Sequence, residues 1–153
     1  MADTRRVNGV QGLKDLVGEH IGYSDWHEVT QEQVNLFADA TGDHQWIHVD
    51  PERAKAGPFG GPIAHGYLTL SLVPYFLPTI MPVEGISMGV NYGCEKVRFP
   101  APVPSGSRLR GRFKLVGYEP LEGGAQLTVQ VTMEREGSDK PVCIAESIGR
   151  RYA

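Results

Sequence analysis

The sequence has little cysteine: its 153 residues include two, Cys94 and Cys143. They form no Cys-x-x-Cys pair and have no zinc-like spacing to a histidine, which is typical of reduced thiols in a cytosolic protein. We interpret both as small, buried apolar residues. Neither a disulfide framework nor a thiolate metal site is therefore expected.

The sequence also lacks a long hydrophobic run and an excess of basic charge. No stretch of about 18 apolar residues is present, and no apolar segment of a secretion signal follows Arg5 and Arg6. The chain has 15 Lys and Arg against 18 Asp and Glu, a formal net charge of -3 at pH 7, which is not the charge balance of a nucleic-acid-binding protein. We expect a cytoplasmic protein that binds neither nucleic acid nor membranes.

The length predicts a single domain spanning residues 1–153, because a chain of this size buries roughly 68–70% of its unfolded surface and can form its own core. Residues 1–12 are polar and contain glycine, so we expect a loose N-terminal arm there. A short helix is predicted over residues 13–17 and a first strand over 21–29.

Two helix starts are marked by capping residues. Thr30, with Gln33 three residues on, forms a capping-box pattern that predicts a helix over residues 31–40 ending at Gly42. Asp50 followed by Pro51 marks the second start, of a short helix that ends before the Gly- and Pro-rich segment 57–62. The segment 57–62 is expected to be a loop.

Residues 63–73 are apolar on nearly every side, which predicts a helix buried all round. Pro74 should kink this helix and Pro78 should end it. Four long runs with much alternation follow, at residues 86–99, 108–118, 125–136 and 142–152. Together with the first strand they predict an α+β fold, in which a five-stranded antiparallel sheet wraps around a long central helix.

The segment between the two predicted helix starts is rich in chemically active side chains. Residues 41–48 hold Asp43, His44, Trp46 and His48 directly after a helix, which is typical of a loop that presents side chains. On a continuous helix Asp43 and His48 would point roughly 140° apart at 3.6 residues per turn. They can converge only where the chain bends, and Gly42 favours such a bend.

Residues 37–51 and 61–66 resemble the MaoC-like dehydratases, and more narrowly the (R)-specific enoyl-CoA hydratases and the NodN-like branch. The family signature reads approximately Gly-Asp-x-Asn-Pro-[Leu/Ile/Val]-His with a small residue six positions on, and the matching residues are Gly42, Asp43, Ile47, His48 and Ala54. Gln45 stands where Asn is usual and Trp46 where Pro is usual. Gln keeps the amide, whereas Trp adds bulk, so the departure bears on substrate size.

The resemblance implies the hotdog fold, two subunits joined edge to edge as a homodimer, and a thioester substrate carried on coenzyme A or acyl carrier protein. It implies reversible addition of water to a trans-2-enoyl thioester to give a 3-hydroxyacyl thioester, without a separate cofactor. For this reaction His48 is the natural base at neutral pH, and we assign Asp43 to orienting the water and passing a proton on. Backbone N–H groups near Gly66 would form the oxyanion hole, a region to which the resemblance also points.

Five further residues have less specific assignments. His65 is expected to position the turn before the central helix through a hydrogen bond, with catalysis as the alternative. Trp46 is either a wall of the acyl pocket or a core residue. Arg98, together with Lys96 and Arg108, is a candidate for the coenzyme A phosphates, although exposed basic residues are commonly just solvated.

Other functions compete for the same residues. A zinc site could use His44, His48 and His65 with Asp43 or Asp50, but Gly42 and Pro51 argue against the continuous helix that this spacing needs, so we expect no metal. A hotdog scaffold could also carry a thioesterase or a non-catalytic acyl-thioester binding module. The presence of both Asp43 and His48 favours the hydratase.

Overall fold

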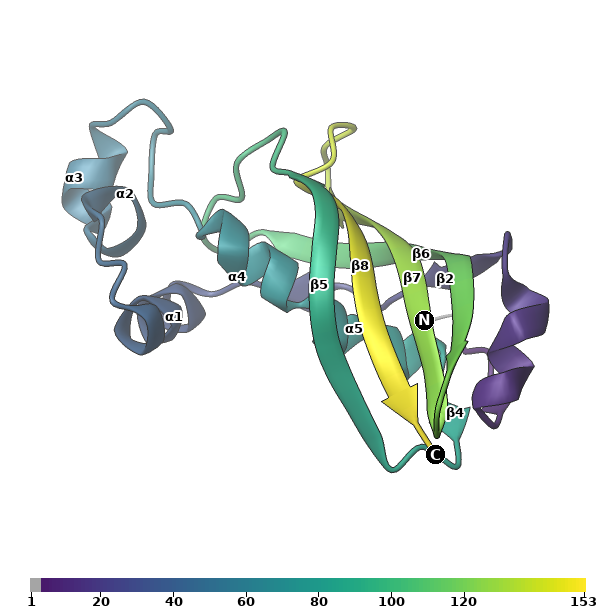
Figure 1. Cartoon of the computed structure of the whole chain (residues 1–153). Coiled ribbons are helices and arrows are strands. Elements are labelled where there is room, and N and C mark those ends of the chain that lie inside the picture. The colour runs from purple at the N-terminus through teal and green to yellow at the C-terminus, as the bar shows by residue number, and fades with distance from the viewer. Residues whose placement is uncertain (1–3) are drawn as a thin grey trace.

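Two consecutive helices, α4 (Gly66–Ser71) and α5 (Val73–Ile80), form the centre of the structure, a computed structural model that describes residues 4–153. A curved antiparallel sheet covers one side of them (Figure 1). Leu68, Leu72, Phe76 and Ile80 are buried against it, because residues three and four apart share one face of a helix.

The prediction of one helix over residues 63–73 is wrong at its start. Residues 63–65 are extended: Ile63 forms an isolated bridge with Pro104, and the Ala64 N–H donates to the Val103 carbonyl. Ile63 and Ala64 are therefore buried as part of an extended segment that pairs with residues 103–104, not as part of a helix. Helix α4 begins only at Gly66.

The two prolines act differently from the prediction. The helix is interrupted at Leu72 and Pro74 lies in the first turn of α5, where its missing N–H is not needed. Pro78, expected to end the helix, lies inside α5, which continues to Ile80. Proline removes a single backbone donor, and burial of Phe76 and Ile80 holds the turns on either side of it.

The expectation that this helix is buried all round is also wrong. Tyr67 of α4 is 69% exposed and Tyr75 of α5 is 57% exposed. Within a single chain the sheet covers one side of the helix pair, so one apolar stripe remains open.

The sheet has the order β2-β6-β7-β8-β5, and each neighbouring pair is antiparallel. The hotdog fold and the five positions of the predicted sheet are confirmed, but the first strand is split in two segments that both pair with β6. The strands are β2 (His20–Tyr23), β3 (His27–Glu28), β5 (Met88–Arg98), β6 (Arg108–Leu121), β7 (Gly124–Arg135) and β8 (Cys143–Tyr152).

The long strands alternate as their sequences predict, with one informative exception. Leu127, Val129, Val131 and Met133 of β7 are all buried on the inner face. Strand β5 is an edge strand, and all its residues except Val97 are exposed. Consequently Cys94 on β5 is exposed, contrary to the expectation, whereas Cys143 is buried; neither forms a disulfide.

The loose N-terminal arm is not observed for residues 4–12. Strand β1 (Val7–Asn8) pairs in parallel with β4 (Val83–Glu84), and a 3-10 helix follows at Val10–Leu16. Val7 and Val10 are buried, so two apolar residues suffice to dock this polar segment. Residues 1–3 of the predicted arm lie outside the described residues.

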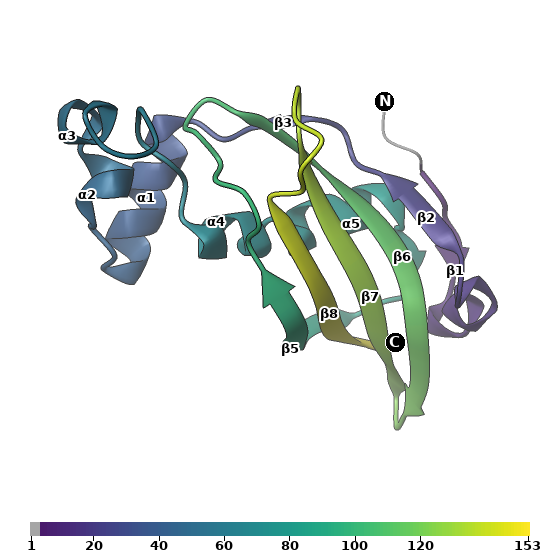
Figure 2. The same ribbon diagram turned by 90° about the horizontal axis from the view of Figure 1, so that it is seen from above.

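Three helices form a lobe next to the start of α4 (Figure 2). They are α1 (Gln31–Thr41), α2 (Trp46–Val49) and α3 (Pro51–Lys55). The Thr30 and Asp50 side chains accept from the Gln33 and Arg53 N–H groups, as predicted. Within residues 4–153, no helix combines the length and apolar character needed to cross a membrane.

Candidate active site

Asp43 is placed by the left-handed turn that ends α1. Gly42 has φ 84°, and its N–H donates to the Ala38 carbonyl, closing the helix. The chain then turns into the single helical turn α2, which the sequence analysis expected to be a loop. This bend brings a carboxylate oxygen of Asp43 and ring nitrogens of His48 and His65 within 4.8 Å of one another. The predicted convergence of Asp43 and His48 is confirmed.

His48 is buried, with 6% of its surface exposed, and its orientation is set by a short hydrogen bond. Its Nδ1 lies 2.6 Å from the Ile63 carbonyl oxygen. A carbonyl can only accept, so Nδ1 carries the proton and Nε2 has a free lone pair. The imidazole therefore presents a basic nitrogen to the site.

A polar network behind His48 holds its backbone. The Gln31 side-chain amide donates to the His48 carbonyl at 2.7 Å, and the Ser105 hydroxyl donates to Gln31 Oε1 at 2.7 Å. The sequence analysis missed these residues and Ile63. Their contacts span 17, 74 and 15 positions, so no local motif marks them.

The environment keeps His48 neutral. Burial lowers its pKa below the usual 6.5, and the nearby His65 acts in the same direction. The hydrogen bond to Ile63 and the charge of Asp43 oppose this without reversing it. A neutral imidazole at physiological pH is the form that a general base needs.

His65, the residue before α4, is buried and contacts both members of the pair. Its Nε2 donates to the Asp43 backbone carbonyl at 2.9 Å and lies 3.9 Å from the Asp43 carboxylate. Its ring stacks on that of His48, with centroids 3.8 Å apart. The hydrogen bond predicted for His65 is observed. It joins the segment before α4 to the turn after α1 that carries Asp43.

The stacking of the two imidazole rings argues against a metal ion held by Asp43, His48 and His65 together. The His48 and His65 rings are inclined by 24° to each other, whereas a metal ion must lie close to the plane of every imidazole that binds it. His48 Nδ1 and His65 Nε2 are also committed to backbone carbonyls. Of the other ligands considered in the sequence analysis, His44 is exposed and pairs with Asp39, and Asp50 caps α3.

Gly66 opens α4 beside an apolar pocket of about 370 Å³. A Cβ at this position would lie 2.7 Å from the Phe99 ring, so glycine is required for close packing here. The Thr69 hydroxyl and His65 Nδ1 are buried near the same helix start without a hydrogen-bond partner among the described residues. Lining residues of the pocket include Phe59, Ile63, Gly66, Thr69, Phe99 and Val103.

Trp46 and the basic residues have their contacts elsewhere than with Asp43 and His48. The Trp46 ring packs under the Arg53 guanidinium at 4.5 Å and against Gly57, so it contacts α3 and the loop after it. Lys96 and Arg108 are paired with Glu146 and Glu136. Arg98 is exposed at the end of β5, and its guanidinium donates to the Val97 carbonyl.

The MaoC-like domain family matches residues 13–137, which is most of the chain. The protein belongs to this family. Membership agrees with the Asp43 and His48 signature, which lies inside the matched range, and with the hotdog sheet, of which all strands except β8 lie inside it.

Named relatives of this MaoC-like protein include enzymes. It is 58% identical over 150 residues to 3-hydroxyacyl-thioester dehydratase Z of Mycobacterium tuberculosis, covering 97% of this chain and 99% of the relative. Nodulation protein N of Rhizobium leguminosarum is 48% identical over 136 residues, which cover 86% of this chain and 84% of the relative. An X-ray structure of a monoamine oxidase regulatory protein from Archaeoglobus has a TM-score of 0.77 and 24% identity, with 99% of each chain covered.

Proposed function

We propose that this MaoC-like protein is an (R)-specific enoyl-thioester hydratase and dehydratase. It adds water reversibly to a trans-2-enoyl thioester to give a 3-hydroxyacyl thioester. The observation that carries the proposal is the convergence of the Asp43 carboxylate and the neutral, oriented His48 imidazole within 4.8 Å. The similarity to a relative named as a 3-hydroxyacyl-thioester dehydratase supports it.

The geometry supports a shared-water mechanism. One water with hydrogen bonds of about 2.8 Å to each group spans the gap between Asp43 and His48. His48 Nε2 takes a proton from this water as its oxygen attacks the β-carbon. Asp43 orients the water, and the pair returns a proton to the α-carbon, so that one water is added overall.

The thioester oxygen gains negative charge in the enolate-like transition state. The first N–H groups of a helix have no partner inside the helix, so they can donate hydrogen bonds to the negatively charged oxygen and stabilise it. In the proposed complex the oxygen lies at Gly66, where the absence of a side chain leaves room for it. The apolar pocket beside Gly66 then receives part of the acyl chain.

The substrate is carried on coenzyme A or acyl carrier protein in this proposal, and no separate cofactor is used. Arg98 is the best candidate for the carrier phosphates, because Lys96 and Arg108 already pair with carboxylates. Trp46 packs on α3 and on Gly57, so any effect of Trp46 on the acyl site would be indirect, through the position of α3. Two free cysteines are consistent with action in the cytoplasm.

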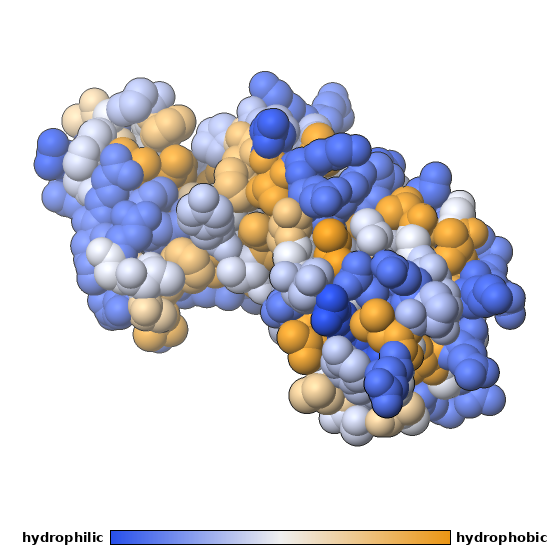
Figure 3. All heavy atoms as spheres, in the orientation of Figure 1, coloured by the Kyte–Doolittle hydropathy of each residue, from blue (hydrophilic) through white to orange (hydrophobic). Residues whose placement is uncertain are grey.

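We also propose that the protein is a homodimer. Strand β5 has an unpaired edge of eleven residues with Met88, Val90 and Tyr92 exposed on it. Phe99, directly after β5, and Tyr67, whose ring contacts it, add exposed apolar area, and Figure 3 shows hydrophobic side chains on the face where β5 lies in Figure 1. Natural proteins cover or pair such edges.

A single assay separates the hydratase from its alternatives. A trans-2-enoyl-CoA is incubated with the protein while the enoyl double-bond absorbance and free thiol are followed in parallel. The hydratase lowers the absorbance without releasing thiol. Thiol release would identify a thioesterase, and binding without either change would identify a non-catalytic module.

A further inference from the structure

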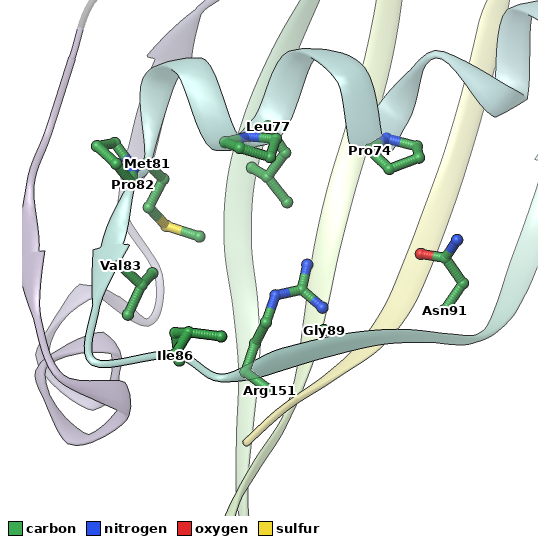
Figure 4. A pocket seen from close by; sticks show the side chains of 10 residues that line it. Pro74, Leu77, Met81, Pro82, Val83, Ile86, Gly89, Asn91 and Arg151 are labelled. Carbon is green, nitrogen blue, oxygen red and sulfur yellow. The ribbon is translucent and has the colours of Figure 1, made fainter. Parts of the chain in front are cut away.

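A second pocket, of about 330 Å³, lies between α5, β5 and β8 (Figure 4). Most of its surface is apolar and comes from α5 and the segment that follows it, including Leu77, Met81 and Ile86. Gly89 and Asn91 of β5 and Arg151 of β8 complete it. Among the described residues that line the pocket, Arg151 alone carries a charge.

The Arg151 guanidinium points from β8 towards α5 in this pocket. Among residues 4–153 it forms no ion pair; its Nη1 donates to the Arg150 carbonyl at 3.1 Å. Burial lowers the pKa of the guanidinium, although arginine remains charged at every physiological pH. A half-buried cation without a counter-charge is unfavourable, and an anionic ligand would remove the penalty.

Two glycines make room for the Arg151 side chain. A Cβ on Gly149 would lie 2.8 Å from Arg151 Nη1, and a Cβ on Gly89 would lie 3.3 Å from the same atom. Neither glycine has a positive φ, so neither is needed for the backbone conformation. Glycine at these two strand positions therefore leaves space for the guanidinium to lie over the sheet, where it lines the pocket.

We infer that Arg151 and the apolar walls around it bind the carboxylate at the end of an aliphatic chain. The guanidinium fork matches the two oxygens of a carboxylate, and the walls from α5 contact the methylene groups beside it. The Asn91 amide lies in the same pocket and adds a hydrogen-bonding group. A neutral methyl end would leave the cation unpaired, so the site favours an acidic ligand over an aliphatic one of the same length.

The carboxylate can come from the substrate itself or from a separate carboxylic acid. Gly66 and Leu77 are eleven residues apart along the successive helices α4 and α5, which corresponds to roughly 16 Å at 1.5 Å per residue. An acyl chain with its thioester at Gly66 could therefore reach Arg151 with its far end. This source rests on the proposed hydratase function, whereas binding of a separate acid does not.

The first test measures binding without catalysis. Octanoate is titrated calorimetrically into wild-type protein, Arg151→Gln and Arg150→Gln. Arg150 is the matched control, since it carries the same charge on the neighbouring residue of β8 but stacks on Tyr92 and donates to Gln126. We expect Arg151→Gln to weaken octanoate binding about 10- to 100-fold, while Arg150→Gln binds like the wild type.

The second test identifies the source of the carboxylate. Turnover of a trans-2-enoyl-CoA that ends in a carboxylate is compared with that of the methyl-ended compound of equal chain length. If the substrate supplies the carboxylate, wild-type kcat/KM favours the acidic compound and Arg151→Gln loses this preference. Arg151→Lys should retain part of it, because the charge remains while the fork is lost. Thermal unfolding of each variant shows that it is folded.

The outcomes separate the two proposals. Turnover of the methyl-ended substrate without any effect of Arg151→Gln on octanoate affinity or on substrate preference would overturn the carboxylate site alone. Octanoate binding that depends on Arg151, without turnover of either substrate, would overturn the hydratase alone. Dissociation of the Arg151→Gln protein into subunits with unchanged octanoate affinity would show that Arg151 serves an interface instead.

Discussion

The two stacked histidines of the site have opposite hydrogen-bonding arrangements. His48 donates through Nδ1 to Ile63, and His65 donates through Nε2 to Asp43. Each carbonyl acceptor determines the tautomer of its histidine. His48 therefore has Nε2 available as a base, while the donating nitrogen of His65 holds the turn on which Asp43 lies. The hydrogen bond from His65 to Asp43 supports the predicted positioning role of His65, whose Nδ1 has no hydrogen-bond partner among the described residues.

The shared-water mechanism predicts how the Asp43 and His48 variants combine. Asp43→Asn and His48→Ala should each lower kcat by about 10²- to 10⁴-fold, with little change in KM because neither residue binds the carrier. The double variant should be scarcely slower than the worse single one, since residues acting on one water form a unit. Steady-state kinetics of the three variants test this. Multiplying losses would show that the residues act independently.

The lowered pKa of His48 predicts the acidic limb of the pH–rate profile. The base works only as a neutral imidazole, and a pKa below 6.5 keeps it neutral to a lower pH than an unperturbed histidine. Measured kcat/KM should therefore hold at pH 6.5 and fall at more acidic pH. His44→Asn is the control, because the exposed His44, whose pKa Asp39 raises, should not affect this limb. A limb centred above 6.5 would contradict the assignment.

At the scale of elements, the start of α4 has two roles: Gly66 packs against Phe99, and the backbone N–H groups there form the proposed oxyanion hole. The Cα of Gly66 faces the Phe99 ring, which follows β5. This contact means that a side chain at position 66 has two effects, a clash with Phe99 and crowding of the thioester oxygen. Only the oxyanion-hole role of this helix start was predicted from the sequence.

A pair of variants separates these two effects. Gly66→Val should lower kcat by about 10²- to 10³-fold, the loss typical of one oxyanion donor. Adding Phe99→Ala removes the clash, so it should restore the thermal stability of the variant but not its turnover. Recovery of both would assign Gly66 to packing alone. Phe99→Ala by itself serves as the reference for kinetics and unfolding.

At the scale of the whole molecule, the open edge of β5 predicts the oligomeric state. Sedimentation at micromolar concentration should show a dimer, and Tyr92→Glu on β5 should shift it towards monomer because a charge would be buried at the joined edge. Leu36→Glu is the control, since Leu36 is an exposed apolar residue on α1. A wild-type protein that sediments only as monomer would remove the dimer from the proposal.

Local signals were sufficient for much of the fold. The caps at Thr30 and Asp50 and the alternation of β7 were predicted correctly, because each depends on interactions within a few residues. The helix start at Gly66 and the continuation of α5 past Pro78 were not. Both depend on packing against segments distant in the sequence, such as Val103 and the inner face of the sheet.

The family resemblance and one short motif were enough to propose Asp43 and His48 as the catalytic pair, because the glycine of the motif permits the bend that brings them together. Three features required the packing of distant segments: which nitrogen of His48 is free, how His65 contacts Asp43 and His48, and that Arg151 faces an apolar pocket. The first two features arise where the turn after α1 and helix α2 meet residues 63–65, and the third arises where β5, β8 and α5 meet. The spacing of residues along the chain does not predict these contacts, because they depend on how elements distant in the sequence pack together.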